Sequence, residues 1–322
     1  MIDSRQLKEL TKEGCITENE PLAGHTTFRI GGPADYFATP SDEKEVAEII
    51  SLCKKAGLPF FVMGNGSNLL VGDKGFRGLV LSISKKMSAC QVEKGTCFGK
   101  PAMPPLKGDN HNEEVMARIH AEAGISLAKL AGEAAREELT GLEFAAGIPG
   151  TLGGAVFMNA GAYGGEIKDV LLCARVLLPD GTIRSFSTEE LSLGYRHSIL
   201  MENHGIVLSA EFLLKKGNKE AVYARMKELA GKRMEKQPLE YPSAGSTFKR
   251  PEGYFAGKLI MDAGLSGYRV GDAMVSEKHC GFVINAGNAT AKEVQTLMQE
   301  VSDKVFEASG VRLEPEVRMI GE

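Results

Sequence analysis

The chain has 322 residues, 43% hydrophobic and 25% charged, and is large enough to bury the core of one large or two average globular domains. Its 38 basic and 42 acidic residues give a net charge of −4, which argues against a nucleic-acid partner because such partners favour a basic surface. Glycine is enriched, at 38 of 322 residues, but follows no Gly-X-Y period, so a collagen-like chain is excluded.

The start of the chain and its cysteines predict a cytoplasmic protein with no membrane partner. Residues 1–10 are charged and lack the apolar segment of a signal peptide, and no run of 18 apolar residues could form a transmembrane helix. The cysteines include no C-x-x-C pair, so we expect reduced thiols. No His/Cys cluster has zinc spacing, and we expect no metal.

Hydrophobic periodicity predicts alternating helices and strands through the first two thirds of the chain. Ser41 can cap a helix that ends at Gly57, because its apolar residues recur at i, i+3, i+4 and i+7. Residues 59–63 and 78–83 are predicted as strands on either side of a first glycine cluster. The segment 85–115 is rich in Lys, Gly and Pro and has no clear period, and we interpret it as a surface insertion.

The later elements are predicted by caps and turns. Ser126 can open a helix, and Asp180-Gly181 predicts a tight reversal between two strands. Thr290 and Glu293 form a capping box for a helix that ends before Gly310. The other expected elements are strands at 171–178, 183–186 and 206–214 and a long charged helix at 219–236. We expect a domain boundary near residues 205–220.

The first glycine cluster, Gly64-Asn-Gly-Ser-Asn68, directly follows a predicted strand. Glycines allow positive φ and let successive N–H groups point to one side, an arrangement that binds anions such as a pyrophosphate. The cluster is not a Rossmann fingerprint, because position 69 is Leu rather than Gly. The alternative is a tight turn between two strands, which local sequence alone favours.

The second cluster runs from Gly141 to Gly165 and shows neither helical nor strand period. Small residues over such a length allow another body to lie close to the backbone, and a flat cofactor is one such body. The alternative is a packed crossing of loops in the core. The two clusters together favour a planar, phosphate-bearing ligand.

Isolated polar residues carry little information by themselves. No histidine is paired with a nucleophile motif, and G-x-S-x-G is missing. Ser246, Arg196 and Glu316 are typical of a turn or of ordinary surface charges. The residues alone therefore predict an α/β or α+β protein with a nucleotide-type ligand.

Six motifs, which follow one another along the chain and are given below, together resemble the UDP-N-acetylenolpyruvoylglucosamine reductase family. Its members are flavoenzymes of peptidoglycan precursor synthesis. The resemblance covers residues 20 to 321, and the turn-rich route from Tyr241 to Tyr254 is similar to a shorter subtype that lacks an extra tyrosine-bearing loop. The motifs are 27–34, 64–69, 141–165, 195–198, 244–249 and 313–318. Thr26 departs from the pattern where asparagine is more usual, and the insertion 85–115 has no family counterpart.

The resemblance implies an α+β architecture with a vanillyl-alcohol-oxidase-type (PCMH-type) FAD-binding fold of two subdomains over residues 20–210, followed by an α+β substrate-binding domain over 211–320. FAD would lie non-covalently between the two subdomains. The implied cofactor-binding residues are Gly64, Asn65, Gly66, Ser67, Asn68, Ile148, Pro149, Gly150, Gly153, Gly154, Asn159, Ala160, Gly161 and Arg233.

The resemblance also implies a reaction. NADPH reduces FAD and leaves, the enolpyruvyl ether of UDP-N-acetylglucosamine enters, and a hydride passes from flavin N5 to its C3. Arg196 would bind the substrate carboxylate, Glu316 would stabilise the enol intermediate, and Ser246 would donate a proton to C2. Tyr163 and Lys236 would contact the substrate. The alternatives are a flavin oxidoreductase acting on an alcohol or lactone, and a nucleotide-binding scaffold without redox chemistry.

Overall fold

The computed structural model describes residues 15–95 and 116–322. Contacts divide the chain into two compact units, each assembled from separate stretches of sequence. Unit 1 comprises residues 1–40, 44–82 and 232–322, and unit 2 comprises 41–43 and 83–231. The predicted domains, an FAD-binding domain over residues 20–210 and a substrate-binding domain over 211–320, are defined by function rather than by contacts. They stay a prediction.

The amino-terminal part of unit 1 is a sheet with the strand order β1-β2-β5-β3. β1 pairs with β2 antiparallel, whereas β5 lies parallel to both β2 and β3. The strands are β1 (Ile16–Pro21), β2 (Pro33–Ala38), β3 (Phe60–Met63) and β5 (Phe76–Ser82), joined by η1 (Leu22–His25) and α2 (Glu43–Lys55). The helix predicted after Ser41 and the strands predicted at 59–63 and 78–83 are confirmed.

In the carboxyl-terminal part of unit 1, α8 packs on a three-stranded sheet, β14-β15-β16, and α7 packs against α8. Thr290 caps α8 in the predicted capping box with Glu293, and Gly310 ends the helix at φ 72°. Both predictions are confirmed. The elements are α7 (Ala256–Asp262), β14 (Arg269–Val270), β15 (Ala273–Val275), β16 (Val283–Asn285) and α8 (Ala291–Ser309).

The two parts of unit 1 share one hydrophobic core. Phe28, Ile30 and Leu70, from the amino-terminal part, are buried in the same cluster as Val294 and Leu297 of α8. Burying such a side chain stabilises a fold by roughly 1.5–3 kcal/mol. The cluster therefore joins segments that lie more than 200 residues apart in the sequence.

Two further contacts join the parts of unit 1. β4 (Leu69–Val71) pairs in parallel with β17 (Arg318–Ile320). The Asp73 carboxylate accepts hydrogen bonds from the backbone N–H groups of Ala291, at 2.7 Å, and Lys292, at 3.0 Å. These are the first residues of α8, where backbone donors lack partners inside the helix, so a carboxylate from the other part caps it.

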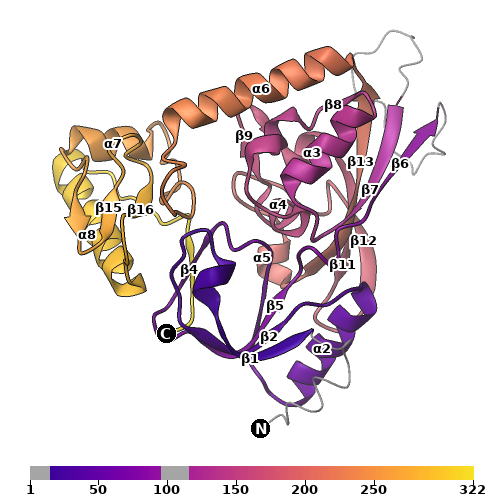
Figure 1. The fold of residues 1–322 in the computed structure, drawn as a ribbon, viewed down its shortest axis with the longest axis horizontal. Coiled ribbons are helices and arrows are strands. Elements are labelled where there is room, and N and C mark those ends of the chain that lie inside the picture. Colours follow the sequence, from indigo (N-terminus) through magenta and orange to yellow (C-terminus); the bar gives the residue numbers. More distant parts are fainter. Residues whose placement is uncertain (1–14, 96–115) are drawn as a thin grey trace. The chain divides into compact units, whose positions relative to one another are not determined.

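Unit 2 contains an antiparallel sheet with the order β12-β11-β13-β7-β6, in which β8 also pairs with β13. Figure 1 shows α3 and α4 on one face of this sheet. Its strands are β6 (Cys90–Gly95), β7 (Met116–Glu122), β8 (Leu139–Thr140), β11 (Leu171–Leu177), β12 (Ile183–Ser187) and β13 (Ile206–Lys216). The other elements are α3 (Leu127–Arg136), η2 (Glu143–Gly147), α4 (Leu152–Met158), β9 (Gly161–Ala162), β10 (Gly165–Glu166), η3 (Ile167–Asp169) and α5 (Leu200–Asn203).

Several predictions for this region are confirmed. Ser126 caps α3, its side chain accepting from Lys129 N–H at 3.2 Å, and β11 and β12 form the hairpin around Asp180-Gly181. The predicted strand at 206–214 is β13. The predicted charged helix is α6 (Lys219–Lys236), which carries the chain from unit 2 into unit 1.

Two segments of unit 2 contain elements that their sequence pattern did not indicate. Within the segment 85–115, β6 forms an edge strand against β7; residues 96–115 lie outside the described part, and the interpretation of the segment as a surface insertion stays a prediction. An edge strand with an exposed face shows little hydrophobic alternation. The second glycine cluster contains α4, whose buried Leu152, Ala155 and Val156 have helical spacing that Gly153 and Gly154 obscure.

Across residues 15–95 and 116–322, no helix has the length and apolar character needed to cross a bilayer. The cysteines at 15, 53, 90, 173 and 280 form no disulfide in this part of the chain. Nor do its His, Cys, Asp and Glu side chains gather in threes as metal ligands would.

Candidate functional site

The Gly64–Asn68 turn connects two strands of unit 1, because β3 ends at Met63 and β4 begins at Leu69. Gly66 has φ 60°, and a Cβ there would stand 2.3 Å from the carbonyl oxygen of His25. Its own carbonyl accepts a hydrogen bond from Thr27 N–H at 3.3 Å. Only glycine fits this position, so the turn packs tightly against the segment before β2.

Ser246 and Glu316 lie on adjacent backbone segments of unit 1. Lys249 N–H donates to Glu314 O, and Glu316 N–H donates to Thr247 O, each at 2.8 Å. Ser246 is exposed and Glu316 is half-buried. The structure thus brings together two of the three predicted catalytic residues, which are 70 positions apart in the sequence.

The same pair of segments contacts the Gly64–Asn68 turn. The Asn68 amide donates to Glu316 O at 3.2 Å, and Arg318 N–H donates to Asn68 O at 3.0 Å. The backbone of Arg318 is therefore bound to the last residue of the turn that is predicted to bind an anion. Sequence reasoning gave Arg318 no role, and only the pairing of β4 with β17 could have indicated one.

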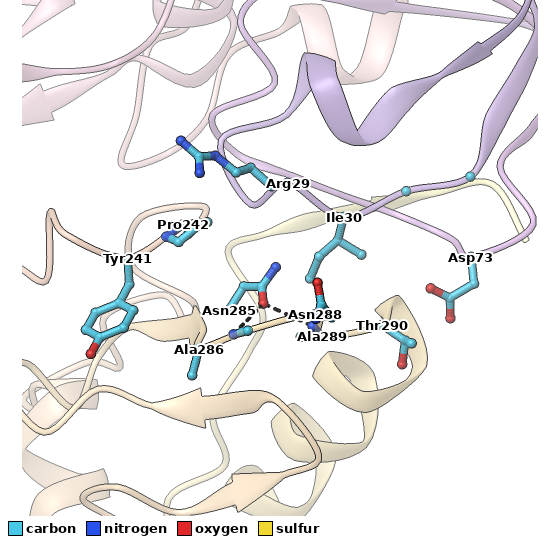
Figure 2. A pocket seen from close by; sticks show the side chains of 13 residues that line it. Arg29, Ile30, Asp73, Tyr241, Pro242, Asn285, Ala286, Asn288, Ala289 and Thr290 are labelled. Atoms are coloured by element: carbon cyan, nitrogen blue, oxygen red, sulfur yellow. Dashed lines mark hydrogen bonds between the residues drawn. The ribbon is translucent and has the colours of Figure 1, made fainter.

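A pocket of about 610 Å³ in unit 1 lies near this turn in sequence but holds none of the predicted catalytic residues. In Figure 2, Arg29 and Tyr241 stand on one side of it and Asp73 on the other. Its polar groups largely bind one another: Asn285 Oδ1 accepts from the N–H groups of Gly287, at 3.1 Å, and Ala289, at 3.0 Å. The Asp73 carboxylate caps α8, and we therefore do not place the reaction here.

In unit 2, the second glycine cluster is organised by the buried side chain of Asn159. Asn159 ends α4 in the left-handed conformation, with φ 43°. Its amide donates to Glu166 Oε2 and to Gly194 O, both at 2.9 Å, and its oxygen accepts from Lys168 N–H at 3.1 Å. The side chain is thus fully engaged within the protein, and it ties the end of α4 to the segments around Glu166 and Gly194.

Arg196 lies beside this cluster, in the loop that Asn159 binds. Its backbone is left-handed, at φ 52°, and its guanidinium stands 5.2 Å from the Tyr195 ring centroid and 3.5 Å from Gly161 O. Tyr163 is also left-handed, at φ 54°, and 39% exposed. Non-glycine residues with a left-handed backbone are strained, and strained residues are concentrated at functional sites.

Arg233 and Lys236 occupy the last turn of α6, where a basic residue also complements the helix dipole. The backbone there is bound by Lys278, whose ammonium donates to Met234 O at 2.8 Å. Among the predicted site residues, unit 1 holds Gly64, Asn65, Gly66, Ser67, Asn68, Arg233, Lys236, Ser246 and Glu316. Unit 2 holds Ile148, Pro149, Gly150, Gly153, Gly154, Asn159, Ala160, Gly161, Tyr163 and Arg196.

Comparison with known proteins gives consistent results. Residues 34–187 match an FAD binding domain, and residues 237–320 match the C-terminal domain of UDP-N-acetylenolpyruvoylglucosamine reductase. The reductases of that name from Agathobacter rectalis and Lachnoclostridium phytofermentans are 57% and 53% identical, over 95% and 99% of this chain and 94% and 97% of theirs. The crystal structure of the Thermus caldophilus reductase is 36% identical and covers 95% of this chain and 98% of its own, with a TM-score of 0.73.

An FAD binding domain of the vanillyl-alcohol-oxidase type, joined to an α+β carboxyl-terminal region, defines a flavin-dependent oxidoreductase. Over nearly its whole length the chain belongs to the UDP-N-acetylenolpyruvoylglucosamine reductase family. The resemblance noted from the six sequence motifs is thereby confirmed.

The ion pair beneath the second glycine cluster predicts an acid sensitivity. The hydrogen bond from Lys168 Nζ, at 2.7 Å, with that from Asn159, lowers the pKa of Glu166 below its ordinary 4.5. A lowered folded-state pKa stabilises the fold above the unfolded-state pKa, and the contribution is lost as the pH falls through the folded-state value. We expect Glu166→Gln to lower Tm at pH 7 and to differ progressively less from wild type below pH 4.5.

The measurement is thermal unfolding from pH 7 to pH 3.5, with Glu93→Gln as the control, an exposed acid of β6 in the same unit. A Tm difference between Glu166→Gln and wild type that stayed constant over this range would contradict the prediction.

Proposed function

We propose that the protein reduces the enolpyruvyl ether of UDP-N-acetylglucosamine to UDP-N-acetylmuramate, with NADPH as hydride donor and non-covalent FAD as carrier, in the bacterial cytoplasm. Membership of a family named for this reductase supports the proposal. The observation that carries it is the meeting of the Ser246, Glu316 and Gly64–Asn68 segments within unit 1.

The Gly64–Asn68 turn suits the pyrophosphate of FAD. Among the described residues, the backbone N–H groups of Gly66, Ser67 and Asn68 donate to no other backbone group. Successive free N–H groups at a turn with positive φ form an anion-binding concavity. When bound, FAD would accept the hydride of NADPH and deliver it to the substrate. We assign the flavin to the stretch from Ile148 to Gly161, and Arg233 to the cofactor.

Arg196 would bind the substrate carboxylate. A planar guanidinium can donate two parallel hydrogen bonds to a carboxylate, and it stays charged at any physiological pH. The left-handed backbone of Arg196 and the Asn159 bond to the neighbouring Gly194 hold this loop in one conformation. Tyr163 would contact the substrate near Arg196, and Lys236 would meet its phosphates.

Ser246 would protonate C2 after the hydride has reached C3. A serine hydroxyl is a weak acid, so it can act only on a strongly basic acceptor, which the enolate-like carbon provides. Glu316 would stabilise the enol form of the substrate, and its backbone contact with Thr247 keeps it close to the serine.

The first test is turnover. We expect NADPH oxidation to depend on the enolpyruvyl substrate, followed as the loss of absorbance at 340 nm under air and under nitrogen. Oxidation that proceeded equally well with oxygen as the only acceptor would support an alcohol- or lactone-type flavin oxidase instead. A purified protein that never takes up FAD would rule out both enzymes.

Ser246→Ala separates the two halves of the reaction. NADPH should still bleach the flavin, whereas reoxidation by the enolpyruvyl substrate should slow by roughly 10²–10⁴-fold, the usual contribution of a positioned acid. Anaerobic stopped-flow absorbance measures both rates. Ser309→Ala, which removes a hydroxyl that donates to Val305 O and accepts from Val311 N–H at the end of α8, is the control. Equal reoxidation rates in Ser246→Ala and wild type would remove Ser246 from the mechanism.

Gly66→Ala tests the pyrophosphate turn. The new Cβ would meet His25 O at 2.3 Å, so the turn must shift and at least one N–H loses its aim at the ligand. We expect FAD affinity to fall about tenfold to a hundredfold, the loss of one hydrogen bond to a charged group. Gly57→Ala is the matched control, because φ is 63° there but no atom lies within 4 Å of the added Cβ. Flavin titration followed by fluorescence should leave Gly57→Ala close to wild type; equal losses in both variants would contradict a binding role for the turn.

A further inference from the structure

Thr27 makes contacts with two of the segments to which the proposed reaction is assigned. Its N–H donates to Gly66 O at 3.3 Å, in the Gly64–Asn68 turn. Its hydroxyl donates to Ser243 O at 2.7 Å, and its carbonyl accepts from Ser243 N–H at 3.2 Å. A single half-buried residue therefore connects the turn to Ser243, which lies 216 positions further along the sequence.

Ser246 lies only three residues beyond Ser243, and the chain on its other side is also fixed. Thr247 N–H donates to Gly281 O at 2.9 Å, and the Thr247 hydroxyl accepts from Val283 N–H at 2.8 Å. Between these anchors, Gly245 is left-handed at φ 79° and Ser246 is exposed. The position of Ser246 is therefore set by the hydrogen bonds of Ser243 before it and of Thr247 after it. Thr27, the partner of Ser243, also contacts the Gly64–Asn68 turn.

Thr27 itself is held firmly. Phe28, the next residue, is 1% exposed within the core of unit 1, and its carbonyl accepts from the Asn285 amide at 3.3 Å. Asn285 N–H in turn donates to Pro242 O at 2.9 Å. Residues 242–243 are thus bound on one side by Thr27 and on the other by β16, which holds the turn and the serine segment on one fixed stretch of backbone.

We propose that Thr27 is a positioning residue that sets the distance of Ser246 from the cofactor, and that its hydroxyl is required for efficient protonation of the substrate but not for binding or reduction of the cofactor. The proposal deepens the function proposed above and rests on it. Thr27 contacts no reacting atom; the proton that reaches C2 still comes from Ser246, which regains one from solvent. A misplacement of about 1 Å at such a group can slow a reaction by roughly a hundredfold.

The test compares Thr27→Val with Thr27→Ser. Valine keeps the shape of threonine but leaves Ser243 O without its side-chain donor, whereas serine retains the hydroxyl. Thr39→Val is the control, since among the described residues the Thr39 hydroxyl donates to Cys15 O, at 3.5 Å, in unit 1. FAD content, Tm and the two half-reactions are measured for each holoenzyme by anaerobic stopped flow.

In Thr27→Val we expect full FAD content, flavin reduction by NADPH within about twofold of wild type, and reoxidation by the enolpyruvyl substrate slowed roughly ten- to a hundredfold. Thr27→Ser should recover most of the reoxidation rate, and Thr39→Val should match wild type in both steps. Reoxidation of Thr27→Val at the wild-type rate would overturn the proposal, as would a parallel loss of FAD binding or a failure of Thr27→Ser to rescue. A wild-type enzyme whose flavin the substrate cannot reoxidise would instead refute the proposed function itself.

Discussion

The parallel pairing of β4 with β17 is the constraint on which the arrangement of unit 1 depends. The pairing places Arg318, the first residue of β17, beside Asn68. Glu316 lies two residues before β17 and is therefore held close to the Gly64–Asn68 turn. The pairing closes the long loop between β4 and β17, and the entropy that loop closure costs grows only with the logarithm of loop length. Three backbone pairs would still be marginal alone, and the shared core around Phe28 and Leu70 supplies the burial that makes them persist.

In unit 2, the loops around the second glycine cluster are held in place by one buried side chain. The buried amide of Asn159 uses its donors and its acceptor on Glu166, Gly194 and Lys168. A buried amide left unsatisfied would cost about 1–3 kcal/mol, so each of these bonds restricts the loop strongly. The bond to Gly194 also holds the Arg196 loop at the end of α4. The Asn159 side chain therefore both orders the glycine cluster and fixes the position of the Arg196 loop.

Local chemistry could be predicted from the sequence, and long-range backbone pairing could not. Ser126 and Thr290 each accept a hydrogen bond from a backbone N–H group three residues further along. Such a contact is local, so the residue types alone predict the start of the helix. The contacts between Asn68 and Glu316 and between Thr27 and Ser243 use main-chain groups that every residue carries, and no composition marks them. Glycines that serve close packing, such as Gly153 with a Cβ site 3.1 Å from Ala123, hide the helical period of α4. The roles proposed for Arg196, Ser246 and Glu316 came from the family resemblance, because nothing in the sequence around them distinguishes them from surface residues.

Backbone strain supports the placement of function around the second glycine cluster. Of the eight non-glycine residues with positive φ among residues 15–95 and 116–322, five lie between Asn159 and His204, and they include Tyr163 and Arg196. A left-handed conformation costs an ordinary residue about 1–2 kcal/mol, and it persists only where the surroundings over-determine it. Tyrosine and arginine gain no local hydrogen bond from that conformation, unlike asparagine, which tolerates it. Their strain is therefore not explained by turn chemistry, and it marks two loops, one at Tyr163 between β9 and β10 and one at Arg196, as candidates for function.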